Sequence, residues 1–277
     1  MQITQVTFPQ PDLCVMQVRE DAALYEAEIQ RQYEQYRQYY PVRGVDAADV
    51  TRELIEQRYG VQTFRLEAIN HLLTYEFPAL RAQYCMQNGL WPLTDADPHL
   101  LSDDETGFAV ECTFALMPQH PITGYTGHTL PGNGHTGVKT LLAQTAAACG
   151  VAPCDWAVQF VAESRIETLQ EKLREGGSSL DTFLKNTDKT RAELHQDLCE
   201  AVQSDLAQGI VLYNVARQEG LLTTPEQLEE EITRMEKISS MNNYARTNPT
   251  AQMNISVRLH NQRALEWLRA HNRFEEV

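Results

Sequence analysis

The chain has 277 residues, enough for two domains of ordinary size with a sizeable core. It carries 23 basic and 38 acidic side chains, which gives a net charge of −15 at pH 7. A field of that sign repels phosphate backbones and anionic lipid, so we expect neither nucleic acid nor a membrane surface as a partner. The N-terminus alternates apolar and polar residues, unlike a signal peptide, and no apolar stretch is long enough to span a membrane. We therefore expect a cytoplasmic protein whose cysteines are reduced.

The first part of the chain mixes strand and helix patterns. Residues 3–18 are typical of extended structure, and helical spacing of tyrosines follows over residues 21–40. A second helical pattern covers residues 61–88, where Pro78 should kink or restart the helix. Residues 90–93 and 107–117 then read as strands. This order predicts an α+β domain with helices on one face of a small antiparallel sheet.

A short loop lies between the tyrosine-rich helix and the next one, within Val42–Gly60. A loop held between two helices is presented to solvent, so the residues at its tip decide what it can touch. Its tip, Gly44–Asp49, contains two carboxylates and no cation. The tip is therefore predicted to repel anionic partners.

A composition break separates the first part from a helical second part. Residues 118–137 contain five glycines, and no strand pattern follows. Thr190 with Glu193, and Thr224 with Gln227, form capping boxes that mark two helix starts. We therefore predict an α+β domain over 1–120, a linker over 121–137 and an all-α domain over 138–277. The helices expected in the second part span 138–149, 153–174, 179–186, 190–219 and 250–271.

Six segments, in this order, resemble trigger factor, the bacterial chaperone of nascent chains. The segment RELIEQRYG at residues 52–60 resembles the one that follows the family's ribosome-docking loop. NGLWPL, at 88–93, resembles its Glu-Gly-Leu-x-Pro turn. The other four segments cover residues 108–130, 178–198, 211–232 and 264–277. The resemblance implies a ribosome-binding-type domain joined to the helical C-terminal chaperone domain.

Two departures from the family pattern limit what the resemblance implies. The family's middle domain, a prolyl isomerase, is absent, so we expect no isomerase activity. The family's docking loop reads Gly-Phe-Arg-x-Gly-x-x-Pro, and here only its first glycine, Gly44, is kept. Val45 stands in place of Phe, Asp46 in place of Arg, Ala47 at the following basic position and Ala48 at the second glycine. We therefore do not expect the protein to dock on the ribosome as trigger factor does.

By resemblance, we expect an ATP-independent holdase that transiently buries apolar segments of unfolded or nascent polypeptides. Each candidate client-binding residue, taken alone, is explained equally well as a core residue between helices. The alternative is an interaction module that holds one specific folded partner, or a second copy of itself as a homodimer. The candidates are Leu142, Trp156, Phe160, Phe183, Leu184, Tyr213 and Met235.

No motif predicts an enzyme, a cofactor or a metal. Residues 132–140 nearly spell a phosphate loop, but Val138 separates the last glycine from the lysine that this motif requires next to it. Cys149 and Cys154 are spaced more widely than zinc ligands favour, and no second cysteine pair accompanies them. We therefore expect neither a nucleotide nor a metal.

Overall fold

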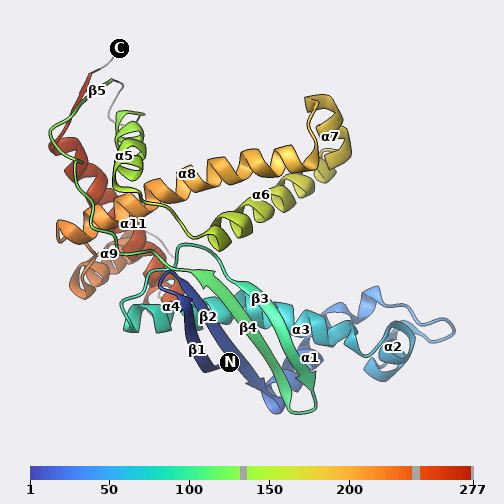
Figure 1. Cartoon of the computed structure of the whole chain (residues 1–277). Helices are drawn as coiled ribbons and strands as arrows, with labels where there is room; N and C mark the ends of the chain where they lie inside the picture. Colours follow the sequence, from blue (N-terminus) through green and yellow to red (C-terminus); the bar gives the residue numbers. More distant parts are fainter. Residues whose placement is uncertain (132–135, 239–243, 276–277) are drawn as a thin grey trace. The chain divides into compact units, whose positions relative to one another are not determined.

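A computed structural model describes residues 1–131, 136–238 and 244–275 (Figure 1). The chain divides into two compact units, which are described separately. The N-terminal unit comprises Met1–Pro9, Cys14–Asn88 and Ala96–Thr113. The C-terminal unit comprises Gln10–Leu13, Gly89–Asp95 and the chain from Phe114 onward. Within the described ranges, no helix is both long enough and apolar enough to cross a membrane.

Four strands form the sheet at the N-terminus, in the order β1-β2-β4-β3. β4 alternates as predicted, because Phe108, Val110, Cys112 and Phe114 are all buried. β3 pairs antiparallel with β4, and the register shifts between Leu100 and Ser102. The strands are β1 (Gln2–Gln10), β2 (Leu13–Asp21), β3 (Asp97–Asp104) and β4 (Gly107–Ala115).

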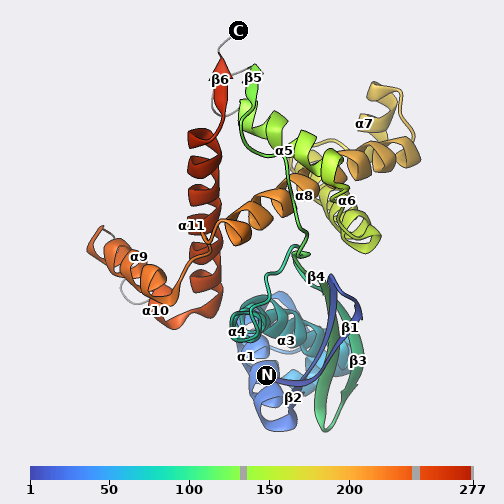
Figure 2. The same cartoon turned by 60° about the vertical axis from the view of Figure 1, so that its left-hand side comes forward.

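Helices cover one face of this sheet, which confirms the predicted α+β class (Figure 2). Pro78 restarts the helix as expected: one helix ends at Tyr75 and the next begins at Phe77. The helices are α1 (Ala22–Tyr36), α2 (Arg52–Tyr59), α3 (Gln62–Tyr75) and α4 (Phe77–Gln87), with short 3₁₀ turns η1 (Arg37–Tyr39) and η2 (Ala47–Asp49).

The strand predicted at residues 90–93 is wrong, and the strand at Asp97–Asp104 was not predicted. This segment forms no strand: Pro92 makes an isolated bridge to Leu116, next to backbone hydrogen bonds of Trp91 and Leu93. β3 has an almost wholly exposed burial pattern because it is an edge strand, so it lacks the apolar alternation that marks β4.

The C-terminal region is largely helical, as predicted. It also contains a two-stranded parallel sheet of β5 (Thr129–Pro131) and β6 (Arg273–Glu275), which the sequence did not predict. Both predicted capping boxes form: Thr190 with Glu193, and Thr224 with Gln227. The helices are α5 (Thr136–Cys149), α6 (Asp155–Glu175), α7 (Leu180–Thr187), α8 (Arg191–Gln218), α9 (Pro225–Ile238), α10 (Tyr244–Thr247) and α11 (Pro249–Ala270).

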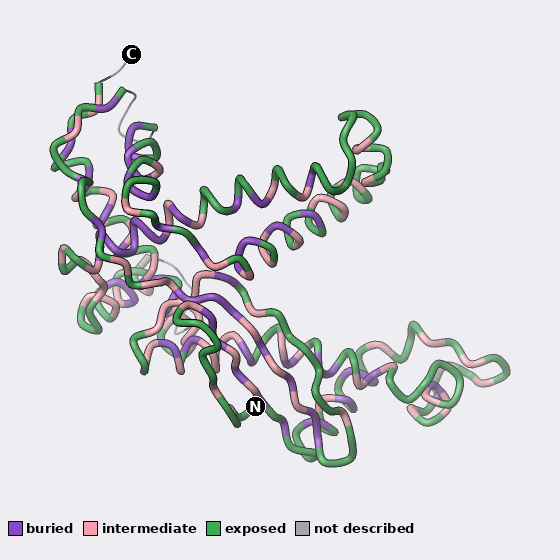
Figure 3. Tube along the Cα trace, in the orientation of Figure 1, coloured by how far each residue is buried: buried purple, intermediate pink, exposed green. Residues whose placement is uncertain are grey.

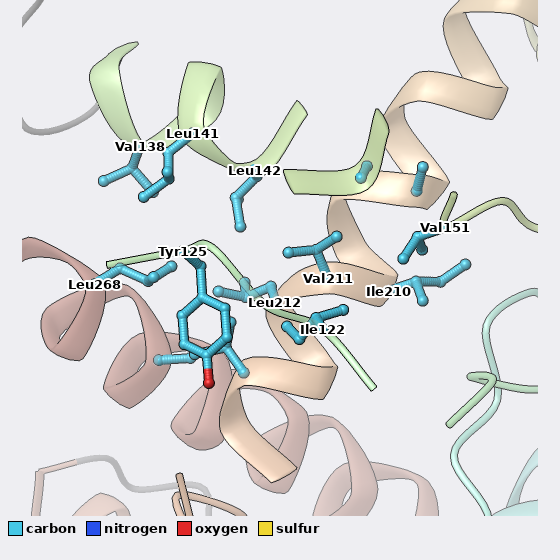
Figure 4. Close-up of a cluster of buried hydrophobic side chains, with 14 of the residues drawn as sticks. Ile122, Tyr125, Val138, Leu141, Leu142, Val151, Ile210, Val211, Leu212 and Leu268 are labelled. Atoms are coloured by element: carbon cyan, nitrogen blue, oxygen red, sulfur yellow. The ribbon is translucent and has the colours of Figure 1, made fainter. Parts of the chain in front are cut away.

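The core of the C-terminal unit surrounds the second half of α8 (Figures 3 and 4). Every residue from Ile210 to Ala216 is buried, and all of them except Tyr213 and Asn214 belong to this core, together with side chains of α5 and α11. Ile122, Tyr125 and Leu130 lie in the predicted linker, and all three are buried in this core. The domain limits 1–120, 121–137 and 138–277 stay a prediction.

Candidate functional site: the loop tip and the arm tip

Tyrosines hold the two ends of the loop at residues 42–50. The Tyr33 hydroxyl donates a hydrogen bond to the Val50 carbonyl at 2.8 Å, and the Tyr59 hydroxyl donates to the Pro41 carbonyl at 2.8 Å. Tyr40 packs edge-on against the Tyr59 ring, with centroids 5.3 Å apart. Tyr33 and Tyr40, two of the helically spaced tyrosines of residues 21–40, therefore help to fix the base of the loop.

The tip of the loop faces solvent. Gly44 has φ +84°, a left-handed conformation that favours glycine. Asp46 is exposed, and its carbonyl accepts a hydrogen bond from the Asp49 amide at 2.9 Å as η2 begins. Val45 is half-buried and Ala48 is exposed, while Ala47 is the first residue of η2. Within the described ranges no basic side chain forms an ion pair with Asp46, so its charge is available to any partner.

The chain around the loop is acidic as well. Residues 1–120 contain eight arginines, no lysine and 18 carboxylates, a net charge of −10. Several of these arginines are already paired with carboxylates. Arg31 contacts Glu28 at 2.6 Å, and Arg52 contacts both Glu26 and Glu56. The N-terminal part of the chain therefore carries two thirds of the excess negative charge.

We use the term arm for the segment from α6 through α7 to α8, residues 155–218, in which α6 and α8 pack side by side (Figure 1). Four buried side chains form the centre of their seam, Val158 and Ala162 on α6 and Cys199 and Val202 on α8, and Val161, Leu198 and Leu206 pack half-buried against them. Charged pairs flank it, with Arg165 3.0 Å from Asp205. This buried cluster is smaller than the core around the second half of α8, so the arm gains less from packing.

The arm tip, α7, carries apolar side chains that are only half-buried. Leu180, Phe183 and Leu184 share one face of the helix at i, i+3 and i+4 spacing. No residue of α7 is fully buried. The helix is well defined at both ends: the Ser179 hydroxyl accepts from the Thr182 amide at 3.2 Å, and Asp188 ends it with φ +52°. The tip is therefore an ordered helix with an unburied apolar face.

The predicted client-binding residues fall into three environments. Phe183 and Leu184 lie together on α7, half-buried. Trp156 and Phe160 stack on α6 with ring centroids 4.9 Å apart and planes 10° apart, and both are half-buried. Met235 lies apart from them on α9 and is 37% exposed.

Leu142 and Tyr213 are buried, with exposed fractions of 7% and 2%, so an incoming chain cannot reach more than a small part of either side chain. The sequence analysis missed Leu180, although its spacing from Phe183 and Leu184 was the signal that could have found it.

In the part of the chain that the structure describes, no group of three or more His, Cys, Asp or Glu side chains is arranged to hold a metal ion. All six cysteines are free, and the Cys149 sulfur accepts a hydrogen bond from the Thr123 amide at 3.4 Å. Gly132–His135, most of the glycine-rich part of the phosphate-loop-like segment, lies outside the described residues.

Comparisons with known proteins agree with this architecture. The family model described as bacterial trigger factor protein matches residues 1–133, and the model of the trigger factor C-terminus matches residues 157–270. The trigger factor of Moorella thermoacetica (strain ATCC 39073 / JCM 9320) is 33% identical over 76 residues, which is 27% of this chain. That alignment spans 17% of the Moorella protein.

A solved structure described as "Promiscuous Substrate Recognition in Folding and Assembly Activities of the Trigger Factor Chaperone" aligns with 96% of this chain and 99% of its own. Its TM-score is 0.45 at 7% identity. The two family models together cover most of the chain, one on each side of α5, with no prolyl isomerase domain between them. The chain therefore belongs to the trigger factor family, as a distant member with the N-terminal and C-terminal domains.

Proposed function

We propose that the protein is an ATP-independent holdase that transiently binds apolar segments of unfolded or nascent polypeptides in the cytoplasm. The observation that carries this proposal is the arm tip, where Leu180, Phe183 and Leu184 form an apolar face with no fully buried residue. A folded monomer normally buries such a face, and an exposed one marks a binding surface. The stacked pair Trp156 and Phe160 offers a second patch on the same arm.

Separate small patches suit clients that share no sequence. Each apolar contact contributes little, and several used together give binding that tolerates many sequences and releases readily. A client would use Phe183 and Leu184 at the tip and Trp156 and Phe160 on the shaft, with Met235 as an outlying contact. Holding a client in this way needs only a binding equilibrium.

The test is suppression of aggregation of two unrelated denatured proteins at stoichiometric amounts. We expect suppression by the natural chain and a loss of several-fold when Phe183→Ser and Leu184→Ser are combined. Leu66→Ser is the matched control, because Leu66 is 49% exposed but lies on α3, outside the arm. Inertness of the natural chain towards both clients, with one folded partner or a homodimer recovered instead, would favour a dedicated interaction module.

The same proposal includes the absence of prolyl isomerase activity. Only residues 134–156 separate the two matched ranges, and α5 occupies Thr136–Cys149 of them. A domain needs about 50 residues or more. Acceleration of a proline-limited refolding reaction, above a control without the protein, would contradict this part of the proposal.

We also propose that the loop does not dock on the ribosome in the manner of the family. Two unit charges about 4 Å apart interact by about 4 kcal/mol at an effective dielectric near 20. Replacing a cation with Asp46 at a contact to an anion therefore exchanges an attraction of that size for a repulsion. Salt-sensitive co-sedimentation of the natural chain with large ribosomal subunits, abolished by altering Asp46, would overturn this.

A further inference from the structure

A cysteine and a histidine contact each other on α8, at the seam of the arm. His195 and Cys199 are four residues apart, so their side chains lie on the same face of the helix, about one turn apart. The Cys199 sulfur is 3.6 Å from Nδ1 of His195 and 4.0 Å from its Nε2. The thiol can therefore donate its proton to a neutral imidazole, which is the contact that a thiol nucleophile and its general base require.

Helix α6 supplies polar groups on the other side of this pair. One oxygen of the Glu163 carboxylate is 4.0 Å from Nε2 of His195, and the other is 3.0 Å from Arg191. Because a carboxylate attracts an imidazolium, Glu163 stabilises the ring once it has taken up a proton. Gln159 also accepts a hydrogen bond from the Cys199 thiol, at 3.9 Å, but an amide oxygen does not take up the proton. His195 is therefore the base of this group.

Access to the sulfur atom is narrow. Cys199 is 9% exposed, whereas the side chain of His195 is 32% exposed and connects the pair to solvent. A sulfur atom with so little exposure admits a small neutral reactant such as hydrogen peroxide. A bulky disulfide such as oxidised glutathione reaches it only if α6 and α8 separate. The site therefore favours a small oxidant.

The other five cysteines lack this arrangement. Burial raises the pKa of four of their thiols, which therefore stay protonated at neutral pH and are poor nucleophiles. These four are Cys85, with a pKa of about 11, Cys14 and Cys112, each with a pKa of about 12, and Cys154. The sulfur of the fifth, Cys149, accepts a hydrogen bond from the Thr123 amide at 3.4 Å. Within the described ranges, Cys199 alone among the six pairs its sulfur with an imidazole.

We propose that Cys199 is a peroxide-sensitive thiol, with His195 as its base, and that its oxidation loosens the pairing of α6 with α8. The inference goes beyond the proposed function and does not depend on it. His195 takes the thiol proton, and the thiolate attacks one oxygen of hydrogen peroxide. An S–O bond forms as the O–O bond breaks, and the leaving hydroxide takes the proton from the ring and departs as water. The sulfur gives up an electron pair and becomes a sulfenic acid, and the peroxide is reduced by that pair.

The added oxygen falls within a packed seam. The Cys199 side chain is part of the buried cluster that also contains Ala162 and Val202. A sulfenic acid needs more volume than a thiol, and its hydroxyl needs a hydrogen-bond partner among apolar side chains. Among the described residues this cluster contains no second cysteine, so the sulfenic acid has no partner there with which to form a disulfide. Oxidation should therefore weaken the contact between α6 and α8.

The first test compares sulfenic acid formation at Cys199 and Cys149 in the same molecule. The full chain is reduced, treated with hydrogen peroxide, trapped with dimedone and digested, and the labelled cysteines are quantified by mass spectrometry. Cys149 is half-buried and its sulfur contacts Thr123 instead of an imidazole, so we expect it to be labelled about tenfold more slowly than Cys199. Equal labelling of the two cysteines would overturn the proposal.

A histidine variant separates the action of the base from simple access to the sulfur. His195→Gln keeps a polar side chain that does not take up the proton, so it should slow labelling of Cys199 by about tenfold or more and leave Cys149 unchanged. His195→Leu serves the same purpose if that variant does not fold. His99→Gln is the matched control, because His99 is exposed on β3, outside the arm. Labelling of Cys199 at the natural rate in a folded His195→Gln chain would overturn the assignment of the base.

Hydrogen exchange measures the effect of oxidation on the arm. Peroxide should accelerate amide exchange in α6 and α8 around Cys199 several-fold in the natural chain. Cys199→Ser is the control and should exchange at the same rate with and without peroxide, because serine forms no sulfenic acid. Unchanged exchange in a chain that is fully oxidised at Cys199, or equal acceleration in Cys199→Ser, would overturn the loosening of the arm. None of these measurements uses a client, so a failure to suppress aggregation would leave this inference standing.

Discussion

The loop and the arm are both helical projections, and they are built in opposite ways. The loop has an aromatic base, where Tyr40 packs against Phe64 with centroids 5.4 Å apart, and a charged tip at Asp46. The arm has a shaft with a small buried cluster around Ala162 and Val202, and an apolar tip at Phe183. In each projection the base determines how firmly the tip is held, and the tip determines what can be touched.

This contrast shows that the side chains at the tip of a projection can vary independently of the packing that stabilises its base. The loop has a packed aromatic base, while its tip carries Asp46, a residue that repels anions. The arm presents an apolar tip on a thin seam, and regions that bind ligands are commonly drawn from the less stable parts of a protein. Substitutions in the loop base should therefore change stability most, and substitutions at the loop tip should change it least.

The largest expected effect is in the loop base. Phe64 is fully buried and packs edge-on against Tyr33 and Tyr40. Phe64→Ala leaves a cavity that these rings cannot close, so we expect a loss of about 3–5 kcal/mol in the free energy of unfolding, measured in urea. Leu66→Ala on the same helix is the control, since Leu66 is 49% exposed, and should cost less than about 1 kcal/mol. Equal losses in the free energy of unfolding for Phe64→Ala and Leu66→Ala would contradict the inference that aromatic packing around Phe64 stabilises the base of the loop.

A smaller loss of stability is expected at the ion pair that joins α9 to α11. Glu231 is nearly buried and contacts Arg234 at 2.7 Å and Arg258 at 2.5 Å. The Arg234 hydrogen bond, with help from Arg258 and against the opposing effect of burial, lowers the pKa of Glu231 from 4.5 to about 2. At pH 7, Glu231→Gln should lower the free energy of unfolding by about 1–3 kcal/mol.

The sign of this effect fixes its dependence on pH. Because the folded-state pKa of Glu231 is depressed, its contribution is fully present above about pH 4.5 and is lost as pH falls towards 2. The difference between the natural chain and Glu231→Gln should therefore shrink over that interval in denaturant melts. Glu230→Gln is the control, because Glu230 is exposed and forms no ion pair within the described ranges. A difference that stays constant down to pH 2 would argue against the ion pairs.

A third effect, about 1 kcal/mol, is expected at the joint between the arm tip and α8. The Thr190 hydroxyl accepts from the Glu193 amide, and the Glu193 carboxylate accepts from the Thr190 amide at 2.8 Å. Thr190→Ala removes the cap, whereas Thr190→Ser keeps the hydroxyl. Hydrogen exchange in the first turn of α8 should accelerate in the alanine variant and stay near normal in the serine variant. Equal exchange in both would show that packing alone holds the joint.

Local signals predicted much of the fold, because they act within a few residues. The capping boxes at Thr190 and Thr224, the helix restart at Pro78 and the alternation of β4 all have causes that lie next to one another in the sequence. The parallel pairing of β5 with β6 joins residues more than 140 positions apart, such as Leu130 and Phe274. No local pattern encodes such a pairing.

The candidate site was predicted only in part, for a related reason. Glycine at position 44 and flanking helices were enough to predict an exposed tip. Burial on the helical domain depends on which helices meet, and Ile210–Ala216 of α8 is buried on every side. For that reason the sequence could not separate Tyr213, which is buried, from Phe183, which is half-buried.

The smallest change in stability is expected at the loop tip. Asp46 is exposed and unpaired within the described ranges, so Asp46→Arg should change the free energy of unfolding by no more than about 0.5 kcal/mol. The substitution should still create a weak attraction to anionic surfaces, because it replaces a carboxylate with a guanidinium where the family has arginine.

Co-sedimentation with large ribosomal subunits measures that gain. We expect slight retention of Asp46→Arg at low salt and none at physiological salt, where the Debye length falls to about 8 Å and the acidic surroundings are unchanged. Glu67→Arg makes the same change of charge on an exposed position of α3, outside the loop. Equal retention of both variants would mean that net charge alone determines binding to the subunits. The position of the charge at the loop tip would then have no effect. Retention of Asp46→Arg alone would show that the charge at position 46 determines whether the loop attracts anions.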